Sequence, residues 1–291
     1  MSENLFTRTG FINVNKEQGV SSAREVAVIK KLTGLPCGHM GTLDPMASGV
    51  LPVAVGNATR LFDYFLSKRK RYLAQFTFGI LTDTLDTTGK VIAEGGRIPS
   101  ENEIAEALPR LTGGIMQVPP AYSAKSVGGE RGYKLARAGK TFELAPKLVS
   151  VGEFILKGRV KENVFCFEIE CGSGTYIRSL ARDLGELVGT YASMNSLVRT
   201  KSGCFEIENS VETRCLNREN ISDFLVPADS VLPYPCKTLD AREEKLYLNG
   251  VPAPCGLPEG LYRIYRQDGS FHGVGFSDGT NLKSRLKLCQ K

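Results

Sequence analysis

A glycine-rich stretch near the N-terminus, residues 38–51, holds a carboxylate that could do chemistry. It contains three glycines, one of the two histidines of the chain, His39, and a single acid, Asp44. Because Pro45 disfavours the α region for the residue before it, Asp44 is expected at a turn or an extended corner. The glycines allow other groups to approach such a corner closely. Asp44 is therefore either the cap of a short helix or a reactive group.

Arg178 is a second candidate because of its place in the predicted structure. Residues 164–171 alternate between apolar and polar side chains, which predicts a strand with Phe165, Phe167, Ile169 and Cys171 facing inward. A glycine-rich turn at 172–175 then leads into a predicted helix. A cation in the first turn of a helix gains nothing from the helix dipole. This placement favours a specific anionic partner for Arg178 over the alternative of solvent or a surface ion pair.

Tyr72 follows the most basic run of the chain, residues 67–71. In the predicted strand 72–78, Tyr72 shares one face with the apolar side chains at 74, 76 and 78. The plain interpretation is a core tyrosine after a solvated basic loop. A polar turn follows at 82–89, and its two acids, Asp83 and Asp86, are interpreted as solvated rather than as a metal pair.

Residues 123–147 form a basic segment with glycines and interleaved aromatic side chains. The segment has six basic and two acidic residues, including Lys125 and Arg131. This composition suits a loop that grips a nucleic-acid backbone, and the alternative is an ordinary mobile surface loop with a short helix at 131–138.

The elements that must position these residues are predicted from periodicity and end signals. Strands are expected at 10–16, 50–55, 197–205, 260–269 and 271–276, the last two as a hairpin. Helices are expected from a capping box at 22–25 to Gly34, at 58–66, from a capping box at 100–103, and at 217–225. In strand 197–205, Arg199 and Lys201 are expected to face phosphate or solvent. A linker at 233–236 predicts two domains, residues 1–232 and 233–291.

Composition and charge narrow the class of protein. The chain has 291 residues with 42% hydrophobic and 23% charged residues, as in globular proteins, and its net charge of +6 mildly favours a polyanionic partner. The eight cysteines include no Cys-x-x-Cys pair, and neither histidine has a metal-ligand spacing. We therefore expect no metal, no disulfide framework, no membrane span and a location in the cytoplasm.

Several segments resemble the TruB family of tRNA pseudouridine synthases. The stretch 38–51, Gly-His-Met-Gly-Thr-Leu-Asp-Pro-Met-Ala-Ser-Gly-Val-Leu, is similar to the family's catalytic signature. The Lys-Arg-Tyr ending at Tyr72, the basic segment 123–139, Tyr-Ile-Arg-Ser-Leu at 176–180 and the strand 197–205 resemble further family segments in the same order. The resemblance implies an α+β fold with a mixed, largely antiparallel sheet, flanking helices and a small β-rich, PUA-like C-terminal domain.

The family resemblance also implies roles for individual residues. Asp44 would be the catalytic residue, Arg178 its ion-pair partner, and Tyr72 would stack on the flipped base and help to remove its C5 proton. Five further residues would contact the RNA, namely His39, Leu197, Lys125, Arg131 and Tyr176. An isomerisation of uridine needs no cofactor, and none is expected. Whether Asp44 attacks C1′, attacks C6 or deprotonates C2′ stays open at this point.

The implied function is the isomerisation of uridine 55 in the TΨC loop of tRNA by a stand-alone, monomeric enzyme. The alternatives are a guide-RNA-dependent synthase of the related archaeal or eukaryotic type and a non-catalytic tRNA-folding chaperone. An Asp-dependent glycosidase is disfavoured because no second acid has a suitable place in the sequence.

Overall fold

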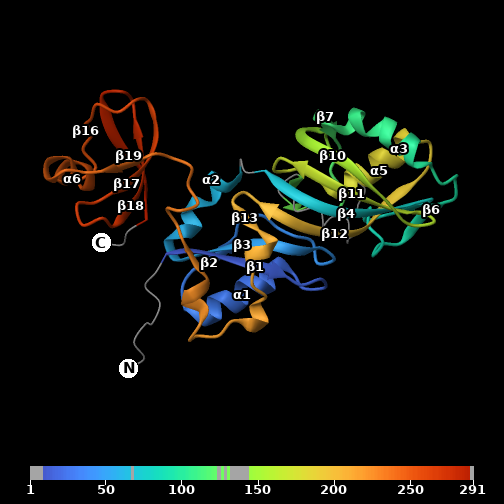
Figure 1. Cartoon of the computed structure of the whole chain (residues 1–291), viewed down its shortest axis with the longest axis horizontal. Helices are drawn as coiled ribbons and strands as arrows, with labels where there is room; N and C mark the ends of the chain where they lie inside the picture. Colours follow the sequence, from blue (N-terminus) through green and yellow to red (C-terminus); the bar gives the residue numbers. More distant parts are fainter. Residues whose placement is uncertain (1–8, 67–68, 123–125, 128–129, 132–143, 289–291) are drawn as a thin grey trace.

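The computed structural model describes residues 9–66, 69–122, 126–127, 130–131 and 144–288. Two sheets dominate these residues: a large mixed sheet built from residues 10–227, and a five-stranded sheet built from residues 236–287. Figure 1 shows the five-stranded sheet at one end of an elongated molecule. A membrane-spanning helix is not found in the described part of the chain, whose longest helix has 12 residues.

The large sheet has ten strands, and its main path runs β14-β1-β3-β12-β4-β11-β10-β7, with β2 beside β3 and β13 beside β12. Its strands are β1 (Gly10–Lys16), β2 (Cys37–His39), β3 (Ser48–Val55), β4 (Lys70–Phe78), β7 (Gly113–Gln117), β10 (Lys147–Lys161), β11 (Val164–Cys171), β12 (Ala192–Ser202), β13 (Phe205–Glu206) and β14 (Leu225–Pro227). All neighbours are antiparallel except β12 and β3. The predicted mixed, largely antiparallel sheet is confirmed.

The alternation of β4 and β11 places one face of both strands in the core. Tyr72 lies opposite Ile169, and Ala74 lies opposite Phe167. These side chains are buried, as are the other inward positions predicted for both strands. Since successive strand residues point to opposite faces, Lys70, the first residue of β4, shares the inward face of Tyr72.

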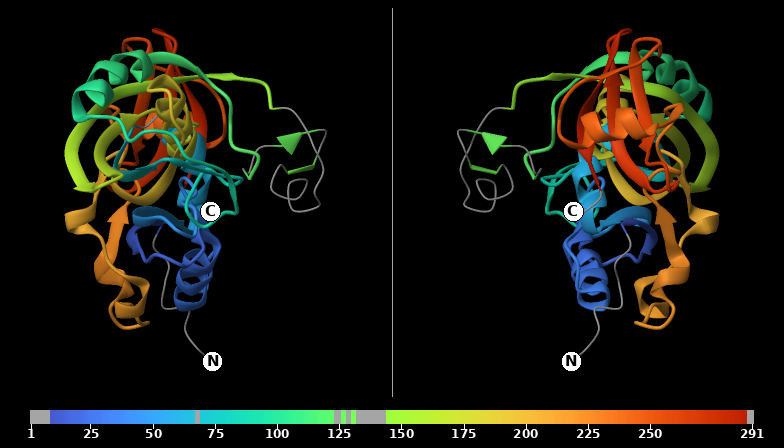
Figure 2. Two further views of the ribbon diagram at one scale, coloured as in Figure 1. Left: turned by 90° about the vertical axis from the view of Figure 1, so that its right-hand side faces the viewer. Right: turned by 90° about the vertical axis from the view of Figure 1, so that its left-hand side faces the viewer.

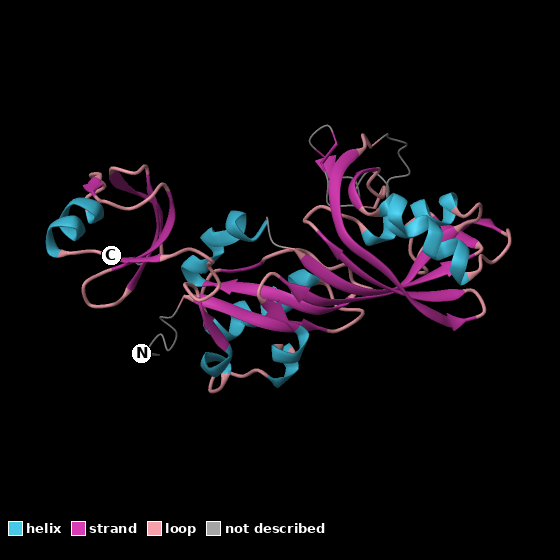
Figure 3. Cartoon of the chain, turned by 45° about the horizontal axis from the view of Figure 1, so that its top comes forward, coloured by secondary structure: helices cyan, strands magenta, loops and turns pink. Residues whose placement is uncertain are grey.

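The helices lie beside the large sheet, and Figure 3 shows them next to its strands. They are α1 (Ser22–Thr33), α2 (Phe62–Leu66), α3 (Glu101–Ala107) and α5 (Ile177–Leu187). The capping box of α3 and the left-handed Gly34 that ends α1 are as predicted. The N-cap of α1 is Ser21, however, and the predicted box at 22–25 is wrong because the Ser22 hydroxyl bonds the backbone of Leu43 instead.

Two other predicted helices need correction. Residues 56–61 form a 3₁₀ turn that precedes α2, so only the second half of the predicted 58–66 helix is α-helical. The predicted helix at 217–225 is wrong, since only Ile221–Phe224 form a 3₁₀ turn. There the Asn217 side chain accepts from the backbone amides of Glu219 and Asn220, as in a helix cap, but the turn ends at Phe224 because the chain enters β14 at Leu225 and pairs with β1.

The five-stranded sheet has the order β15-β17-β18-β19-β16, with α6 (Ala241–Leu248) beside it. Its strands are β15 (Cys236–Thr238), β16 (Ala253–Pro254), β17 (Gly260–Tyr265), β18 (Phe271–Ser277) and β19 (Asn281–Lys287). The predicted hairpin at 260–276 is confirmed as β17 and β18. Val274 and Leu286 share an apolar cluster with Phe11 and Leu61, which joins this sheet to the large one.

Two short pairs of strands complete the described residues. β5 (Ile80–Thr82) pairs with β6 (Val91–Glu94), and the turn between them carries Asp83 and Asp86. β8 (Ser126–Val127) pairs with β9 (Glu130–Arg131), and Figure 2 shows this pair standing to one side of the large sheet. The predicted helix at 131–138 lies outside the described residues, apart from Arg131 itself.

Candidate active site

A pocket of about 1060 Å³ gathers most of the residues predicted to act. The predicted residues that line it are His39, Asp44, Tyr72, Tyr176, Arg178 and Leu197. They come from the corner at 38–51, from β4, from the start of α5 and from β12. Lys125 lies outside the described residues, and of Arg131 only the backbone, at the end of β9, is described.

Asp44 stands at a tight turn and does not cap a helix. Its carbonyl accepts a hydrogen bond from the Ala47 amide at 3.0 Å, and the chain then enters β3 directly. The residue before it is held by Ser22, whose hydroxyl donates to the Leu43 carbonyl at 2.8 Å and accepts from the Leu43 amide at 2.9 Å. Because the carboxylate is 38% exposed, it faces the pocket and is open to a ligand.

Arg178 binds the carboxylate of Asp44. Its Nη2 lies 2.9 Å from Asp44 Oδ2, while its side chain is only 7% exposed, so the predicted ion pair is confirmed. The guanidinium also donates to the carbonyls of Thr84 at 2.9 Å and Tyr122 at 3.0 Å. These contacts fix both the position and the plane of the guanidinium, which presents one edge to Asp44.

Asp86 is a second carboxylate at this centre, and the prediction of a solvated turn is wrong for it. Asp86 is buried, and its Oδ2 lies 3.6 Å from Arg178 Nη1. Its other carboxylate oxygen accepts hydrogen bonds from the hydroxyls of Thr84 and Thr88. Within the turn, Leu85 has a positive φ of 61°. The turn is attached to β12, because the Met194 amide donates a hydrogen bond to the Leu85 carbonyl. This long-range contact, invisible in the sequence, draws Asp86 inward.

Arg199 holds the corner that carries Asp44, and the prediction that it faces phosphate or solvent is wrong. It is 1% exposed. Its Nε donates to the Val50 carbonyl at 2.6 Å, and its Nη2 donates to the Gly41 carbonyl at 2.9 Å. β12 lies parallel to β3 here, with Arg199 opposite Gly49, where a Cβ would come within 2.3 Å of the Arg199 carbonyl oxygen. A glycine with a φ of 99° is therefore required at that position.

Tyr72 and Leu197 form an apolar wall of the pocket, and both are 7% exposed. Burial is the main reason that the pKa of Tyr72 is raised to about 12. The hydroxyl therefore holds its proton at neutral pH, and the resting side chain offers a neutral aromatic surface to a ligand.

His39, Tyr176 and Lys16 occupy the margins of the site. His39 ends β2, and burial, followed by the charge of Arg199, lowers its pKa below the ordinary value. Tyr176 caps α5, and its backbone exchanges two hydrogen bonds with the amide side chain of Gln117. Sequence reasoning missed Lys16, whose buried Nζ donates to the carbonyls of Val20 at 2.7 Å and Pro45 at 3.3 Å. Through the Pro45 carbonyl, Lys16 holds the backbone of the corner that carries Asp44.

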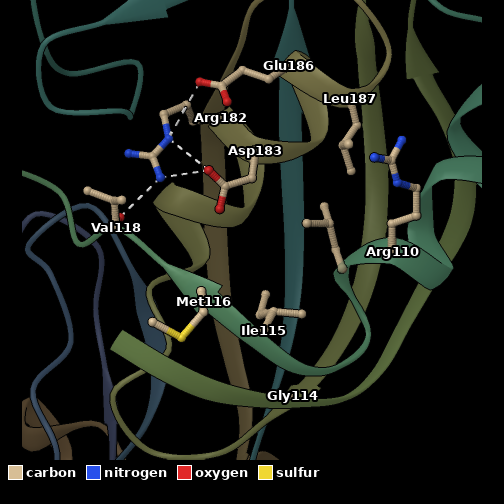
Figure 4. Close-up of a pocket in the computed structure, with 10 residues that line it drawn as sticks. Arg110, Gly114, Ile115, Met116, Val118, Arg182, Asp183, Glu186 and Leu187 are labelled. Carbon is tan, nitrogen blue, oxygen red and sulfur yellow. Dashed lines mark hydrogen bonds and ion pairs between the residues drawn. The ribbon is translucent and has the colours of Figure 1, made fainter. Parts of the chain in front are cut away.

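A second hollow lies between β7, α5 and the 3₁₀ turn Leu108–Leu111. Figure 4 shows Arg182 on its rim, joined to Asp183, Glu186 and the Val118 carbonyl. Burial raises the pKa of Asp183 above its ordinary value. None of the residues predicted to act lines this hollow. Within the described ranges, no cluster of three or more histidine, cysteine or acidic side chains could hold a metal ion.

Comparison with known proteins gives the class. The family model described as the N-terminal domain of TruB family pseudouridylate synthases matches residues 30–177. The model of the tRNA pseudouridylate synthase B C-terminal domain matches residues 178–233. The chain therefore belongs to the TruB family of pseudouridylate synthases.

Among the curated relatives are two clostridial proteins named tRNA pseudouridine synthase B. The protein of Clostridium novyi is 39% identical over 282 residues, which cover 94% of this chain and 97% of the relative. The protein of Clostridium tetani is 38% identical over 276 residues, which cover 91% and 94%. A chain from the crystal structure of a Cbf5–Nop10–Gar1 complex has a TM-score of 0.71 at 23% identity, covering 96% of this chain and 85% of that one. This last likeness shows the shared fold.

Proposed function

We propose that this protein isomerises the uridine at position 55 in the TΨC loop of tRNA to pseudouridine. The observation that carries the proposal is the Asp44–Arg178 ion pair of 2.9 Å at the wall of a pocket that also presents Tyr72. Its relatives at 35–39% identity over more than 90% of the chain bear the name tRNA pseudouridine synthase B. Their names support tRNA as the substrate.

The reaction moves one bond and exchanges one proton. The N1–C1′ bond breaks, the uracil turns, and a C5–C1′ bond forms; C5 loses a proton and N1 gains one. The base is stacked in the RNA, so it must first be flipped into the pocket, at a cost of a few kcal/mol. The pocket supplies a carboxylate for the attack and an apolar surface for the base.

The described residues divide this work among them. Asp44 attacks the nucleotide, and Arg178 holds the carboxylate in place at the wall of the pocket. Tyr72 and Leu197 hold the base between them. Once the C5–C1′ bond has formed and Asp44 is released, the neutral Tyr72 hydroxyl takes the C5 proton as it passes its own proton to the Asp44 carboxylate. Arg199 and Lys16 hold the backbone of the corner, so they act on catalysis by positioning Asp44.

Release of tritium from a tRNA transcript carrying 5-³H-uridine tests this function. We expect release by the unaltered protein and none by the Asp44→Ala variant, while both bind the transcript with similar affinity. An Asp44→Ala variant that releases tritium at the normal rate would refute the role of Asp44. An unaltered protein that is inactive on tRNA but active on another uridine-containing RNA would overturn the substrate and keep the chemistry.

The same assay separates the alternatives. A guide-RNA-dependent synthase would release tritium only after a guide RNA is added, whereas we propose that tRNA alone suffices. A pure tRNA-folding chaperone would accelerate tRNA folding without releasing tritium. The ion pair of Arg178 with two carboxylates favours an enzyme, because a chaperone has no use for a fixed, pocket-facing Asp44.

We further propose that residues 1–232 form the catalytic domain and that residues 233–291 form a PUA-like auxiliary domain. The change of sheet between β14, which ends at Pro227, and β15, which begins at Cys236, supports this division. We also propose that the protein works as a monomer in the cytoplasm, where its scattered thiols would stay reduced. Lys125 and Arg131 would grip the RNA backbone from the segment 123–147.

A further inference from the structure

Lys70 is a buried cation in the pocket that the proposed mechanism does not use. It is the first residue of β4, paired with Cys171 on one side and Ser202 on the other, so it lies in the middle of the large sheet. Its side chain is 9% exposed and lines the same pocket as Asp44 and Tyr72. A buried lysine normally lies next to a carboxylate, since an unpaired buried charge is costly.

Lys70 has no such carboxylate among the described residues. Its Nζ donates to the hydroxyl of Ser173 at 2.6 Å, which is a neutral partner. The two acids that line the pocket, Asp44 and Asp86, both bind Arg178. Burial and the charge of Arg199 together lower the pKa of Lys70 to about 8, which is the response of a cation that lacks an anion.

Two cations converge on this part of the pocket. A Cβ placed on Gly41 would lie 3.5 Å from Lys70 Cε and 3.7 Å from Arg199 Nη1, so both side chains reach the same glycine. Arg199 is occupied by backbone carbonyls, which carry no net charge. The pocket as a whole is lined by three cations, Lys70, Arg178 and Arg199, and by two carboxylates. An added anion would balance this excess.

The neighbours of Lys70 in the basic run behave differently. Arg69 binds Glu170 at 2.9 Å, and Arg71 binds Glu170 at 3.0 Å, both on the outer face of the sheet. Among the described residues of the run, 69–71, the two arginines have acidic partners on the outer face, and strand alternation places Lys70 on the inner face without one. This contrast indicates that the charge of Lys70 is available to an anionic ligand in the pocket.

We infer that Lys70 and Ser173 form a phosphate subsite that holds a backbone phosphate next to the flipped nucleotide. The inference rests on the proposed function, because it requires an RNA strand to enter this pocket. A lysine is a compact cation with three donors, one of which can stay on Ser173 while the others bind phosphate oxygens. The flipped uridine is covalently joined to the phosphates on either side of it. Binding one of these phosphates would therefore fix how far the base enters the pocket towards Asp44.

A double-mutant cycle on binding tests the subsite. Affinity is measured in an Asp44→Asn background, so that the RNA is not turned over, for a TΨC stem-loop of ordinary backbone and for two versions with one neutral methylphosphonate, on the 5′ or the 3′ side of the target uridine. We expect Lys70→Gln to weaken binding of the ordinary RNA roughly 10- to 100-fold, as for a charge-assisted hydrogen bond. One of the two methylphosphonates should weaken binding to the lysine protein and have no further effect on the Lys70→Gln protein.

Arg71→Gln is the matched control, because it removes a cation of the same run that has acidic partners on the outer face. We expect it to change affinity by about twofold or less, and equally for all three RNAs. Lys70→Met, with a thermal unfolding midpoint measured beside it, guards against a folding defect in the glutamine variant. Additive effects of Lys70→Gln and both methylphosphonates in folded protein would overturn the inference.

Tritium release by the otherwise unaltered protein on the ordinary stem-loop separates the two proposals. If release occurs and the cycle is additive, only the phosphate subsite fails. If no release occurs on any tRNA substrate, the proposed function itself fails.

Discussion

Arg178 Nη2 lies 2.9 Å from Asp44 Oδ2, and the arginine reaches this acid from the first turn of a helix far along the chain. The guanidinium is nearly buried, whereas the carboxylate is partly open to the pocket. A fixed cation behind an accessible carboxylate orients that group without blocking the face that would meet a substrate.

The Arg178→Lys variant should keep the positive charge but lose the contacts that the planar guanidinium makes with Asp44, Asp86 and two carbonyls. A lysine cannot bind Asp44, Asp86 and two carbonyls at once in the plane that the guanidinium uses. We expect tritium release to fall by about 100-fold or more, and tRNA affinity to change little. Single-turnover rates and binding measurements would separate the two effects, and a variant with normal single-turnover rate would contradict the role of the ion pair.

Asp86→Asn should reveal how far the second carboxylate supports the first. The amide can still accept hydrogen bonds from Thr84 and Thr88 but no longer balances the charge of Arg178. We expect the free energy of unfolding to fall by about 1–3 kcal/mol. We also expect a lower rate of tritium release, measured at temperatures where the variant is folded. Asp83→Asn, at the other acid of the same turn, is the control that should leave the rate unchanged.

The Tyr72→Phe variant should separate the contribution of the aromatic ring from that of the hydroxyl. The phenylalanine ring can still stack on the base, so affinity for the stem-loop should stay within about twofold. If the Tyr72 hydroxyl relays the C5 proton, tritium release should fall by about 100-fold or more. Release at the normal rate would show that the ring alone suffices and that another group takes the proton.

Lys70 should leave a signature in the pH dependence of stability. Its pKa is about 8 in the folded protein and 10.5 for an ordinary lysine, so between these values the unfolded chain binds more protons and stability rises with pH. The charged and titratable groups that face it are Arg199 on β12 and Cys171 on β11, and burial raises the pKa of Cys171 to about 11.

The difference between the unaltered protein and Lys70→Met isolates this contribution, because other groups titrate alike in both. We expect Lys70→Met to be the more stable protein at pH 7, by on the order of 3 kcal/mol, and this advantage to shrink as pH rises from 8 towards 10.5. Chemical denaturation at several pH values measures it. A pH-independent difference would mean that Lys70 is not a desolvated cation in the folded protein.

Local sequence patterns determined much of the fold and part of the site. The alternation in 164–171 and 72–78, the capping box at 100–103 and the glycine at 34 act through neighbours along the chain, so strands, caps and ends could be predicted from them. Asp44 and Arg178 could be predicted as partners because each stands at a glycine-rich corner and each matches a segment of one family.

Tertiary structure decided the rest, because burial depends on what lies across the sheet. Alternation cannot tell which face of β12 meets the Asp44 corner, so Arg199 was expected outside and is instead among the most buried side chains. Asp86 is inward because β12 pins its turn, a long-range contact that no local pattern contains. Lys70 shares the face of Tyr72 by strand alternation, but its burial depends on the neighbouring strands β11 and β12 and on the Gly41 corner, which come from distant parts of the chain.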